Sequence, residues 1–320
     1  MLTKAPFAIF PTSKKMIADN EGKPTSRVWD VCRTKTFVKP PEMLDPKYPP
    51  FDQPHQFACQ LYGGTWNDYN EVCVFQVFGP CGLRCWYCYV DRMFLQTEEI
   101  IDCRQVAEWL TPEQVRDIWR QSGTKILNLS GGEPTQFPRF MAELAMWMQG
   151  EKALLWFSTN MSSGSRLFDV WEGYFDLRFM TKPHAGIAGC FKGFSPEDAL
   201  DMAGANLDEQ FIFAQRLVKQ RDLEVFFYVP GLVRRGTSQS VIEAFFERLR
   251  QEVDEFAPLR TYILLIKPYA STDPEIWEDY SMNINDSRRV VDVWQGLCRD
   301  HYKPEELWLP SHQIKYQCYR

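Results

Sequence analysis

The stretch GPCGLRCWYCYVD, residues 79–91, places Cys81, Cys85 and Cys88 in a C-x3-C-x2-C pattern. Three thiols are an odd set, because a structural zinc ion normally takes four ligands and a disulfide takes two cysteines. The stretch follows the apolar run VCVFQVF (72–78), which is typical of a buried strand. The chemistry of this site therefore starts directly after the first strand that the sequence predicts.

Five further apolar runs follow along the chain. Each is short, rich in β-branched or aromatic residues and bounded by glycine, proline or polar positions, as strands are. They are KILNLS (125–130), ALLWFST (153–159), GIAGCFK (186–192), EVFFYVP (224–230) and TYILLIKPY (261–269). Amphipathic stretches predict helices over 111–123 with Thr111 as N-cap, 138–150, 206–220, 238–253 and 285–301.

The alternation of strands and helices predicts an α/β fold with a parallel sheet and right-handed crossovers. Both a doubly wound open sheet and a barrel of βα units fit this pattern, and both place ligands at the carboxyl ends of the strands. We expect this core to span residues 71–275. An irregular arm rich in proline and aromatic residues (1–70) packs on it, and a C-terminal helix and tail (276–320) follows.

Charge and hydropathy limit the classes of partner that the protein is expected to bind. The 320 residues include 36 Lys and Arg against 42 Asp and Glu, a net charge of −6 with no extended basic stripe, so the charge does not favour a nucleic-acid partner. The chain has no apolar run long enough to span a membrane, and Pro6 and Pro11 interrupt the N-terminal apolar residues. We expect a cytoplasmic protein without a membrane partner, whose cysteines stay reduced and serve metal binding or catalysis.

Three interpretations of the cysteine stretch follow from spacing alone. The thiolates could bind a [4Fe–4S] cluster through three of its irons, or a zinc ion with a fourth ligand from elsewhere, or they could be unrelated core thiols. Zinc sites usually pair two C-x2-C units, and only one is present here. The spacing favours the cluster, with one iron left without a protein thiolate.

The stretch also resembles a known family. C-x3-C-x2-C after a first strand, with aromatic Tyr87 before the last cysteine, is similar to the motif of the radical S-adenosylmethionine (SAM) superfamily. LNLSGGEPT (127–135) ends the next predicted strand, and its residues Ser130, Gly131, Gly132, Glu133 and Pro134 resemble the family's GGE(P) motif. Glycines let the backbone approach a ligand closely, and a carboxylate with backbone acceptors can hold an amino group. The resemblance is specific at these two motifs only.

The resemblance implies a partial (β/α)6 TIM-like barrel over about residues 72–270, with one [4Fe–4S] cluster on Cys81, Cys85 and Cys88. It implies that SAM binds the open iron and that one electron, from a donor such as flavodoxin or ferredoxin, cleaves SAM to a 5′-deoxyadenosyl radical. The cofactors carry the hard chemistry, and the protein supplies orientation and a dry cavity.

Further SAM-binding positions carry weaker signals. Ser158 and Asn160 stand at the end of the third strand, where the family often meets the SAM ribose or carboxylate, although a helix N-cap cluster fits them equally well. Lys192 resembles the lysine of the DLKG motif in glycyl-radical-enzyme activases, and a turn lysine is the alternative. Val229 at the end of the fifth strand and Tyr87 are expected to present backbone atoms to the adenine, with packing as the alternative for Tyr87.

The sequence leaves the catalytic residues unknown. Cys190, His184 and Tyr228 stand at strand ends or in loops where they could meet a substrate, and we take them as candidates. The cysteines after residue 190 are too few and too widely spaced for a second cluster, and free buried cysteine is a better account of them.

The expected function is that of an oxidoreductase-type radical enzyme that abstracts hydrogen from a small or mid-sized substrate. The alternatives are an activating enzyme that generates a glycyl radical on a partner protein, and a radical SAM enzyme that modifies a peptide or RNA. The long N-terminal arm argues against the compact activases. A non-enzymatic α/β binding module with a structural zinc is a further alternative.

Overall fold

The computed structural model describes the core of the chain and little of the N-terminal arm. The described residues are 4–8, 72–76, 81–88, 107–149, 151, 153–162, 167–168, 185–220, 223–232, 238–264 and 284–303. The candidate residue His184 lies outside them, as do all the residues that delimit the three expected domains. Within the described residues, no helix is long and apolar enough to cross a membrane.

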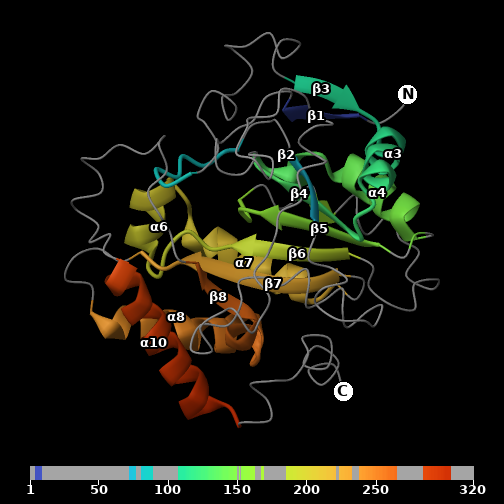
Figure 1. The fold of residues 1–320 in the computed structure, drawn as a ribbon. Coiled ribbons are helices and arrows are strands. Elements are labelled where there is room, and N and C mark those ends of the chain that lie inside the picture. The colour runs from blue at the N-terminus through green and yellow to red at the C-terminus, as the bar shows by residue number, and fades with distance from the viewer. Residues whose placement is uncertain are drawn as a thin grey trace. The chain divides into compact units, whose positions relative to one another are not determined.

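Strands and helices alternate along the core (Figure 1). The strands are β1 (Ala5–Ala8), β2 (Val72–Gln76), β3 (Ala107–Leu110), β4 (Ile126–Ser130), β5 (Leu154–Thr159), β6 (Ala185–Cys190), β7 (Leu223–Pro230) and β8 (Thr261–Leu264). The α-helices are α3 (Pro112–Ser122), α4 (Pro138–Gln149), α6 (Pro196–Ala203), α7 (Leu207–Val218), α8 (Gln239–Arg248) and α10 (Ile284–His301). The short helices are η5 (Pro134–Gln136), η7 (Leu249–Val253) and η8 (Ala257–Arg260). All six predicted strands and all five predicted helices are present.

The larger sheet confirms the predicted α/β class. Its strand order is β2-β4-β5-β6-β7-β8, which is the chain order once β3 is set aside. The pairs β2–β4, β4–β5 and β7–β8 are parallel. A doubly wound sheet reverses its order at a switch point, whereas a barrel of βα units keeps it. The order therefore favours the expected partial barrel, with β2 and β8 as its edges.

Two features were not predicted. β1 and β3 form a separate antiparallel pair, so part of the expected irregular arm is a strand. Each has only four residues, too few for a clear alternation of apolar and polar positions. Helix α6 was also missed, although Ser195 caps its first turn and Gly204 ends it in the left-handed conformation at φ 65°.

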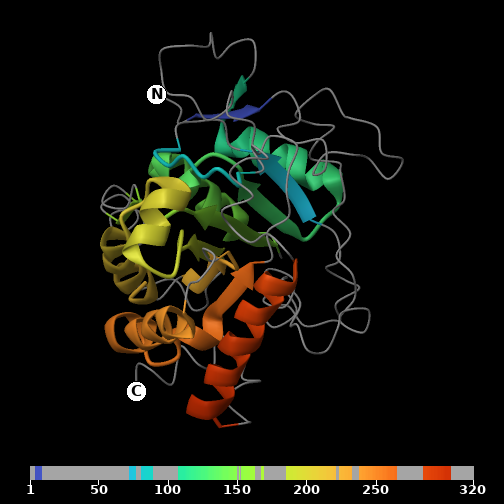
Figure 2. The ribbon, with the colours of Figure 1, turned by 90° about the vertical axis from the view of Figure 1, so that its left-hand side faces the viewer.

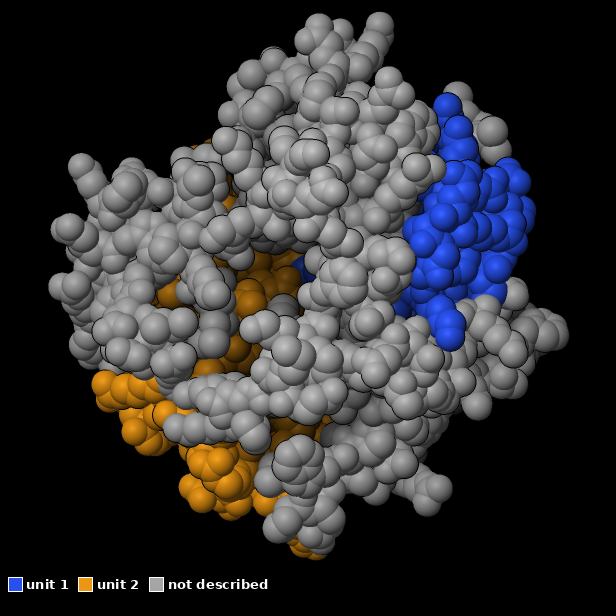
Figure 3. Space-filling view, viewed as in Figure 1, with its two compact units in different colours: residues 1–82, 89–159, 163–187 blue, residues 83–88, 160–162, 188–320 orange. Residues whose placement is uncertain are grey.

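The chain divides into two compact units (Figure 3). Unit 1 comprises residues 1–82, 89–159 and 163–187, and unit 2 comprises residues 83–88, 160–162 and 188–320. In unit 1, helices α3 and α4 pack side by side. In unit 2, α10 packs against α8, as Figures 1 and 2 both show.

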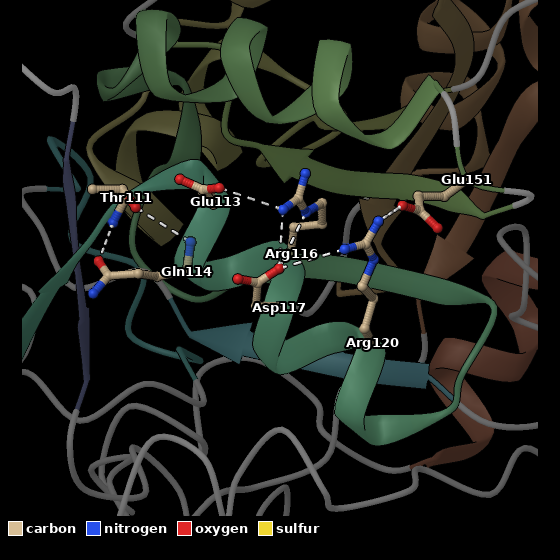
Figure 4. A network of polar contacts seen from close by, with 7 residues as sticks. All are labelled: Thr111, Glu113, Gln114, Arg116, Asp117, Arg120 and Glu151. Atoms are coloured by element: carbon tan, nitrogen blue, oxygen red, sulfur yellow. Dashed lines mark hydrogen bonds and ion pairs between the residues drawn. The ribbon is translucent and has the colours of Figure 1, made fainter.

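Charged side chains of helix α3 form a polar network at the surface of unit 1 (Figure 4). Thr111 and Gln114 form a capping box, because each side chain bonds the other residue's backbone N–H. Arg120 pairs with Asp117 on the same helix and with Glu151, which follows α4. The network therefore links the last turn of α3 to the loop before β5.

Phenylalanine rings form the core of unit 2. The ring of Phe191 lies 4.9 Å from that of Phe211 on α7, 5.5 Å from that of Phe227 on β7 and 5.2 Å from that of Phe245 on α8. Side chains of an extended chain alternate between its two faces. Since Phe191 and Phe227 face the helices, their neighbours Cys190 and Tyr228 face the opposite side of the sheet, which is the interior of a βα barrel.

Candidate functional site

In unit 1, the two motifs start at one edge of the sheet. β2 and β4 are parallel neighbours, and their last residues, Gln76 and Ser130, are register partners. Cys81 follows the end of β2 by five positions, and the glycine pair follows Ser130 directly. Gly131 and Gly132 have φ values of 70° and 33°, which L-residues with a side chain rarely adopt. The SGGEP turn thus needs its glycines for the backbone path itself.

The carboxylate of Glu133 is held in a fixed orientation. The side chain is 1% exposed, and its Oε1 accepts hydrogen bonds from the N–H of Thr135 at 3.2 Å and from its hydroxyl at 2.6 Å. The Thr135 hydroxyl lies 3.5 Å from that of Thr159 at the end of β5. This contact joins the SGGEP turn to the carboxyl end of the neighbouring strand.

The cysteine loop of unit 2 is anchored on the end of helix α6. The N–H of Arg84 donates to the carbonyl of Ala203 at 2.8 Å, and the N–H of Trp86 donates to that of Met202 at 3.2 Å. The Trp86 and Tyr87 side chains pack with Met202 and Leu232 in one buried cluster, against which Cys85 packs. The unpredicted helix α6 therefore positions the loop that carries two of the three motif thiols.

The three motif cysteines offer a thiolate donor set. Cys81, Cys85 and Cys88 are partly exposed and are not joined in disulfides, and the N–H of Cys88 donates to the carbonyl of Cys85 at 3.1 Å in a turn. Soft thiolates are the ligands that iron–sulfur clusters and zinc prefer. Among the described residues, no three His, Cys, Asp or Glu side chains are gathered as a metal site. The donor chemistry fits a cluster, and its ligation by these cysteines stays a prediction.

Tyr87 is part of the buried face of this loop rather than an exposed side chain. It is 7% exposed, and its ring meets that of Trp86 edge-on at 5.5 Å. Burial raises the pKa of Tyr87 well above its ordinary value; the charge of Cys85 adds to this and that of Lys192 opposes it. The structure therefore places the Tyr87 hydroxyl in the electrostatic range of Cys85 and Lys192.

A buried thiol–ammonium pair stands at the end of β6. The ammonium Nζ of Lys192 donates to the Sγ of Cys190 at 3.0 Å, and the two residues are 8% and 2% exposed. Lys192 lies two positions beyond the end of β6, so the predicted strand was slightly too long. Within the part of the chain that the structure describes, Cys190 is the one hydrogen-bond acceptor of this ammonium. An ammonium has three N–H donors, so Lys192 can also donate to a further acceptor.

The charges of this cluster favour an ammonium beside a thiol. Burial opposes the charge of Lys192, but Cys190, Cys85, Tyr87 and Tyr228 together raise the pKa of its ammonium well above the ordinary value. Burial also raises the pKa of the Cys190 thiol, and Lys192 only partly offsets that rise. At neutral pH the pair is therefore Lys192 ammonium and Cys190 thiol.

Gln210 forms hydrogen bonds with the backbone of Cys190 and Lys192. The sequence analysis did not predict this role. The fully buried amide on α7 donates to the carbonyls of Asn160 at 2.6 Å and Cys190 at 2.9 Å, and accepts from the N–H of Lys192 at 3.2 Å. One signal was available, since Gln210 interrupts the apolar stripe that includes Leu207 and Phe211 on the same helix. A buried polar residue on an apolar face needs partners.

The other predicted residues divide between the two units. The Asn160 side chain accepts from the N–H of Ser162 at 2.8 Å and from its hydroxyl at 2.5 Å, and its contact with SAM stays a prediction. Ser158 lies on β5 in unit 1, and Val229 is fully buried on β7 in unit 2. In unit 2, the charges of Cys85, Tyr87, Cys190 and Tyr228 all act on the pKa of Lys192.

Comparisons with known proteins give structural likenesses only. No protein-family model matches the chain, and no curated protein matches it in sequence. SuiB of Streptococcus suis bound to S-adenosylmethionine is 14% identical with a TM-score of 0.46, over 70% of this chain and 49% of that one. Another SuiB structure is 12% identical with a TM-score of 0.48, over 73% and 47%. A structure of TYW1 with a bound lysine–pyruvate adduct is 12% identical with a TM-score of 0.42, over 74% and 77%.

The chain spans about half the length of the SuiB chains that it matches. At these identities and TM-scores the likeness does not decide the activity, the substrate or the partners of this chain. The function therefore has to be argued from the residues themselves.

Proposed function

We propose that this chain is a radical SAM enzyme that binds one [4Fe–4S] cluster through Cys81, Cys85 and Cys88. In such an enzyme, SAM bound to the open iron supplies a carbon radical after one-electron reduction. The residues of this chain hold the cofactors, orient them and exclude water. The proposed substrate is a small or mid-sized molecule, and the electron donor is a flavodoxin- or ferredoxin-type protein.

One observation carries this proposal. The C-x3-C-x2-C stretch follows β2 and the SGGEP turn ends β4, and these two strands are parallel neighbours with Gln76 and Ser130 in register. Parallel strands end at a common edge, where βα folds place their ligands. A chance cysteine cluster and a chance glycine turn would have no reason to start at that same edge.

Two further groups support a bound amino acid moiety. Glu133 is a buried carboxylate held by Thr135, and it suits the amino group of SAM. The Lys192 ammonium has donors beyond its bond to Cys190, and it suits a carboxylate. Each role is proposed separately, from the charge of that residue alone.

Reconstitution tests the cluster. Under anaerobic conditions with iron and sulfide, the protein should become brown and bind iron and sulfide in equal amounts, and Cys85→Ala should abolish both. Cys298→Ala is the matched control, because Cys298 lies on α10 outside the motif. A colourless protein that keeps one zinc ion under the same conditions would favour the non-enzymatic zinc module.

Incubation with SAM and dithionite tests the activity. The reconstituted protein should release 5′-deoxyadenosine, and Lys192→Met should weaken SAM binding in equilibrium dialysis. Reconstituted protein that binds a cluster but never yields 5′-deoxyadenosine would contradict the radical mechanism.

The substrate class needs a separate experiment. The small-molecule fraction of a cell extract should speed the release of 5′-deoxyadenosine by the reconstituted protein, because a substrate consumes the radical. Faster release with a large protein instead would favour a glycyl-radical activase, and faster release with the peptide or RNA fraction would favour a modifying enzyme.

A further inference from the structure

The Cys190 thiol is a buried reactive group that the two motifs leave without a role. It ends β6 on the face of the sheet opposite to helices α7 and α8, and it is 2% exposed. The N–H of Phe191 donates to the carbonyl of Tyr228 at 2.9 Å, so the ends of β6 and β7 lie side by side here. In βα folds, catalytic side chains come from such strand ends.

Both the hydrogen and the lone pairs of this thiol are engaged. The Sγ–H of Cys190 donates to the carbonyl of Phe191 at 3.4 Å, and Sγ accepts from the Lys192 ammonium at 3.0 Å. Burial raises the pKa of Cys190, so the thiol form persists. A protonated thiol is a poor nucleophile, but its weak S–H bond makes it a good donor of a hydrogen atom.

The thiol also lies close to the predicted cofactor site. The charges of Cys85 and Cys190 act on each other, and both act on Lys192. Cys85 is one of the predicted cluster ligands, so a carbon radical generated at the cluster would form in the neighbourhood of Cys190. Gln210 holds the carbonyl of Cys190 and the N–H of Lys192, which fixes the backbone of the pair.

We propose that Cys190 donates a hydrogen atom to a carbon radical formed in this site, and that Lys192 supplies the proton that restores the thiol. This role rests on the proposed function and deepens it. It assigns the enzyme to radical reactions in which a hydrogen atom is returned rather than only removed.

Atoms and electrons are conserved in this hydrogen-atom transfer. The S–H bond of Cys190 breaks homolytically, the radical carbon gains the hydrogen atom, and a thiyl radical remains. One electron from the same one-electron donor reduces the thiyl to a thiolate. The Lys192 ammonium then transfers a proton across the 3.0 Å hydrogen bond and regains one from solvent.

The test uses SAM as the probe, without a substrate. In D2O the thiol of Cys190 exchanges to S–D, so reductive cleavage of SAM should yield 5′-deoxyadenosine with one deuterium at the 5′ carbon. Cys190→Ala and Cys190→Ser should lower the deuterated fraction to the background measured in H2O. Cys190→Ser keeps the size of the side chain and an acceptor for Lys192, so it separates the role from a packing defect.

Two matched variants locate the donor. Cys298→Ala removes a thiol on α10, whose pKa burial raises to about 12, and should leave the deuterated fraction unchanged. Tyr302→Phe removes a hydroxyl that donates to the carbonyl of Glu255, away from the thiol, and should also leave it unchanged. If 5′-deoxyadenosine forms but the deuterated fraction survives in Cys190→Ser, this role is wrong while the proposed function stands. If no 5′-deoxyadenosine forms in any variant, the proposed function fails and this role falls with it.

A second readout needs neither cofactor nor turnover. The infrared difference spectrum between the cofactor-free protein and Cys190→Ala at neutral pH should show an S–H stretching band. Lys192→Met should shift that band, because it removes the hydrogen bond to Sγ. A missing band would mean that residue 190 is a thiolate, and it would overturn the role of Cys190 as a hydrogen-atom donor.

Discussion

The end of β6 in unit 2 and the outer face of α3 in unit 1 are both rich in polar contacts, but they differ in burial. At the end of β6, Gln210 and Lys192 are almost inaccessible to water. On α3, the Arg120 and Asp117 side chains are 48% and 51% exposed. A buried polar group that loses its partner has no water to replace it, whereas an exposed one does. The same kinds of bond should therefore matter very differently in the two regions.

The largest effect is expected for Gln210→Met. Methionine fills a similar volume but removes the hydrogen bonds of Gln210 to the carbonyls of Asn160 and Cys190 and to the N–H of Lys192. At about 1 kcal/mol or more for each of these three buried bonds, the free energy of unfolding should fall by roughly 3 kcal/mol or more. Urea unfolding at constant m-value measures this loss.

Gln220→Met is the matched control for that change. The Gln220 amide follows α7 and donates to the carbonyl of Arg216 at 3.3 Å in a partly exposed position. Its loss should cost under about 1 kcal/mol. Equal losses in the two variants would contradict the contrast between buried and exposed polar groups.

Two glycines differ in the space that their surroundings leave for a side chain. A Cβ on Gly193 would lie 2.6 Å from the backbone nitrogen of Ala199 and 2.7 Å from Cβ of Asp198, so the first turn of α6 would have to shift. Gly193→Ala should therefore destabilise the protein by about 2–3 kcal/mol. Because α6 anchors the cysteine loop, the variant should also bind less iron on reconstitution.

Gly296→Ala should have the opposite sign. Gly296 lies inside α10, and nothing stands within 4 Å of a Cβ placed there. Alanine at such a position should raise the free energy of unfolding by about 0.5–1 kcal/mol. Thermal unfolding of both glycine variants measures the pair, and a stabilised Gly193→Ala would contradict the close packing on α6.

Much of this architecture was readable in the sequence because its signals are local. The six strands of the larger sheet are short apolar runs. The capping box of Thr111 and Gln114 marks the start of α3 within four residues. The four-residue strands β1 and β3 carried no such pattern. Their pairing joins segments about a hundred residues apart, which local periodicity does not report.

The sequence predicted the motif residues of the candidate site but not the residues that hold those motifs in place. Cys81, Cys85, Cys88 and the SGGEP residues stand in short, recognisable runs. The bond from Gln210 to Asn160 spans 50 positions, and the loop on α6 depends on contacts across more than a hundred. Such supports depend on tertiary packing, so a sequence shows at most that a polar residue interrupts an apolar stripe.

A smaller effect is expected at the start of α3. Thr111→Ala removes one arm of the capping box with Gln114 and should cost about 1 kcal/mol of unfolding free energy. Ser238→Ala is the matched control, because Ser238 is the N-cap of α8 but makes no capping bond to it. Chemical denaturation should show a smaller loss for Ser238→Ala, and the reverse order would mean that the capping bond of Thr111 is not made in solution.

The smallest effect is expected for the ion pair between Arg120 and Glu151. Water already screens Arg120, which is 48% exposed, and two long side chains lose rotamer freedom when they pair. A double-mutant cycle with Arg120→Ala and Glu151→Ala should give a coupling energy of about 0.5 kcal/mol or less, and salt should weaken it further. A coupling energy as large as the loss in Gln210→Met would mean that exposure does not govern the strength of polar contacts in this protein, and the contrast between the two regions would fail.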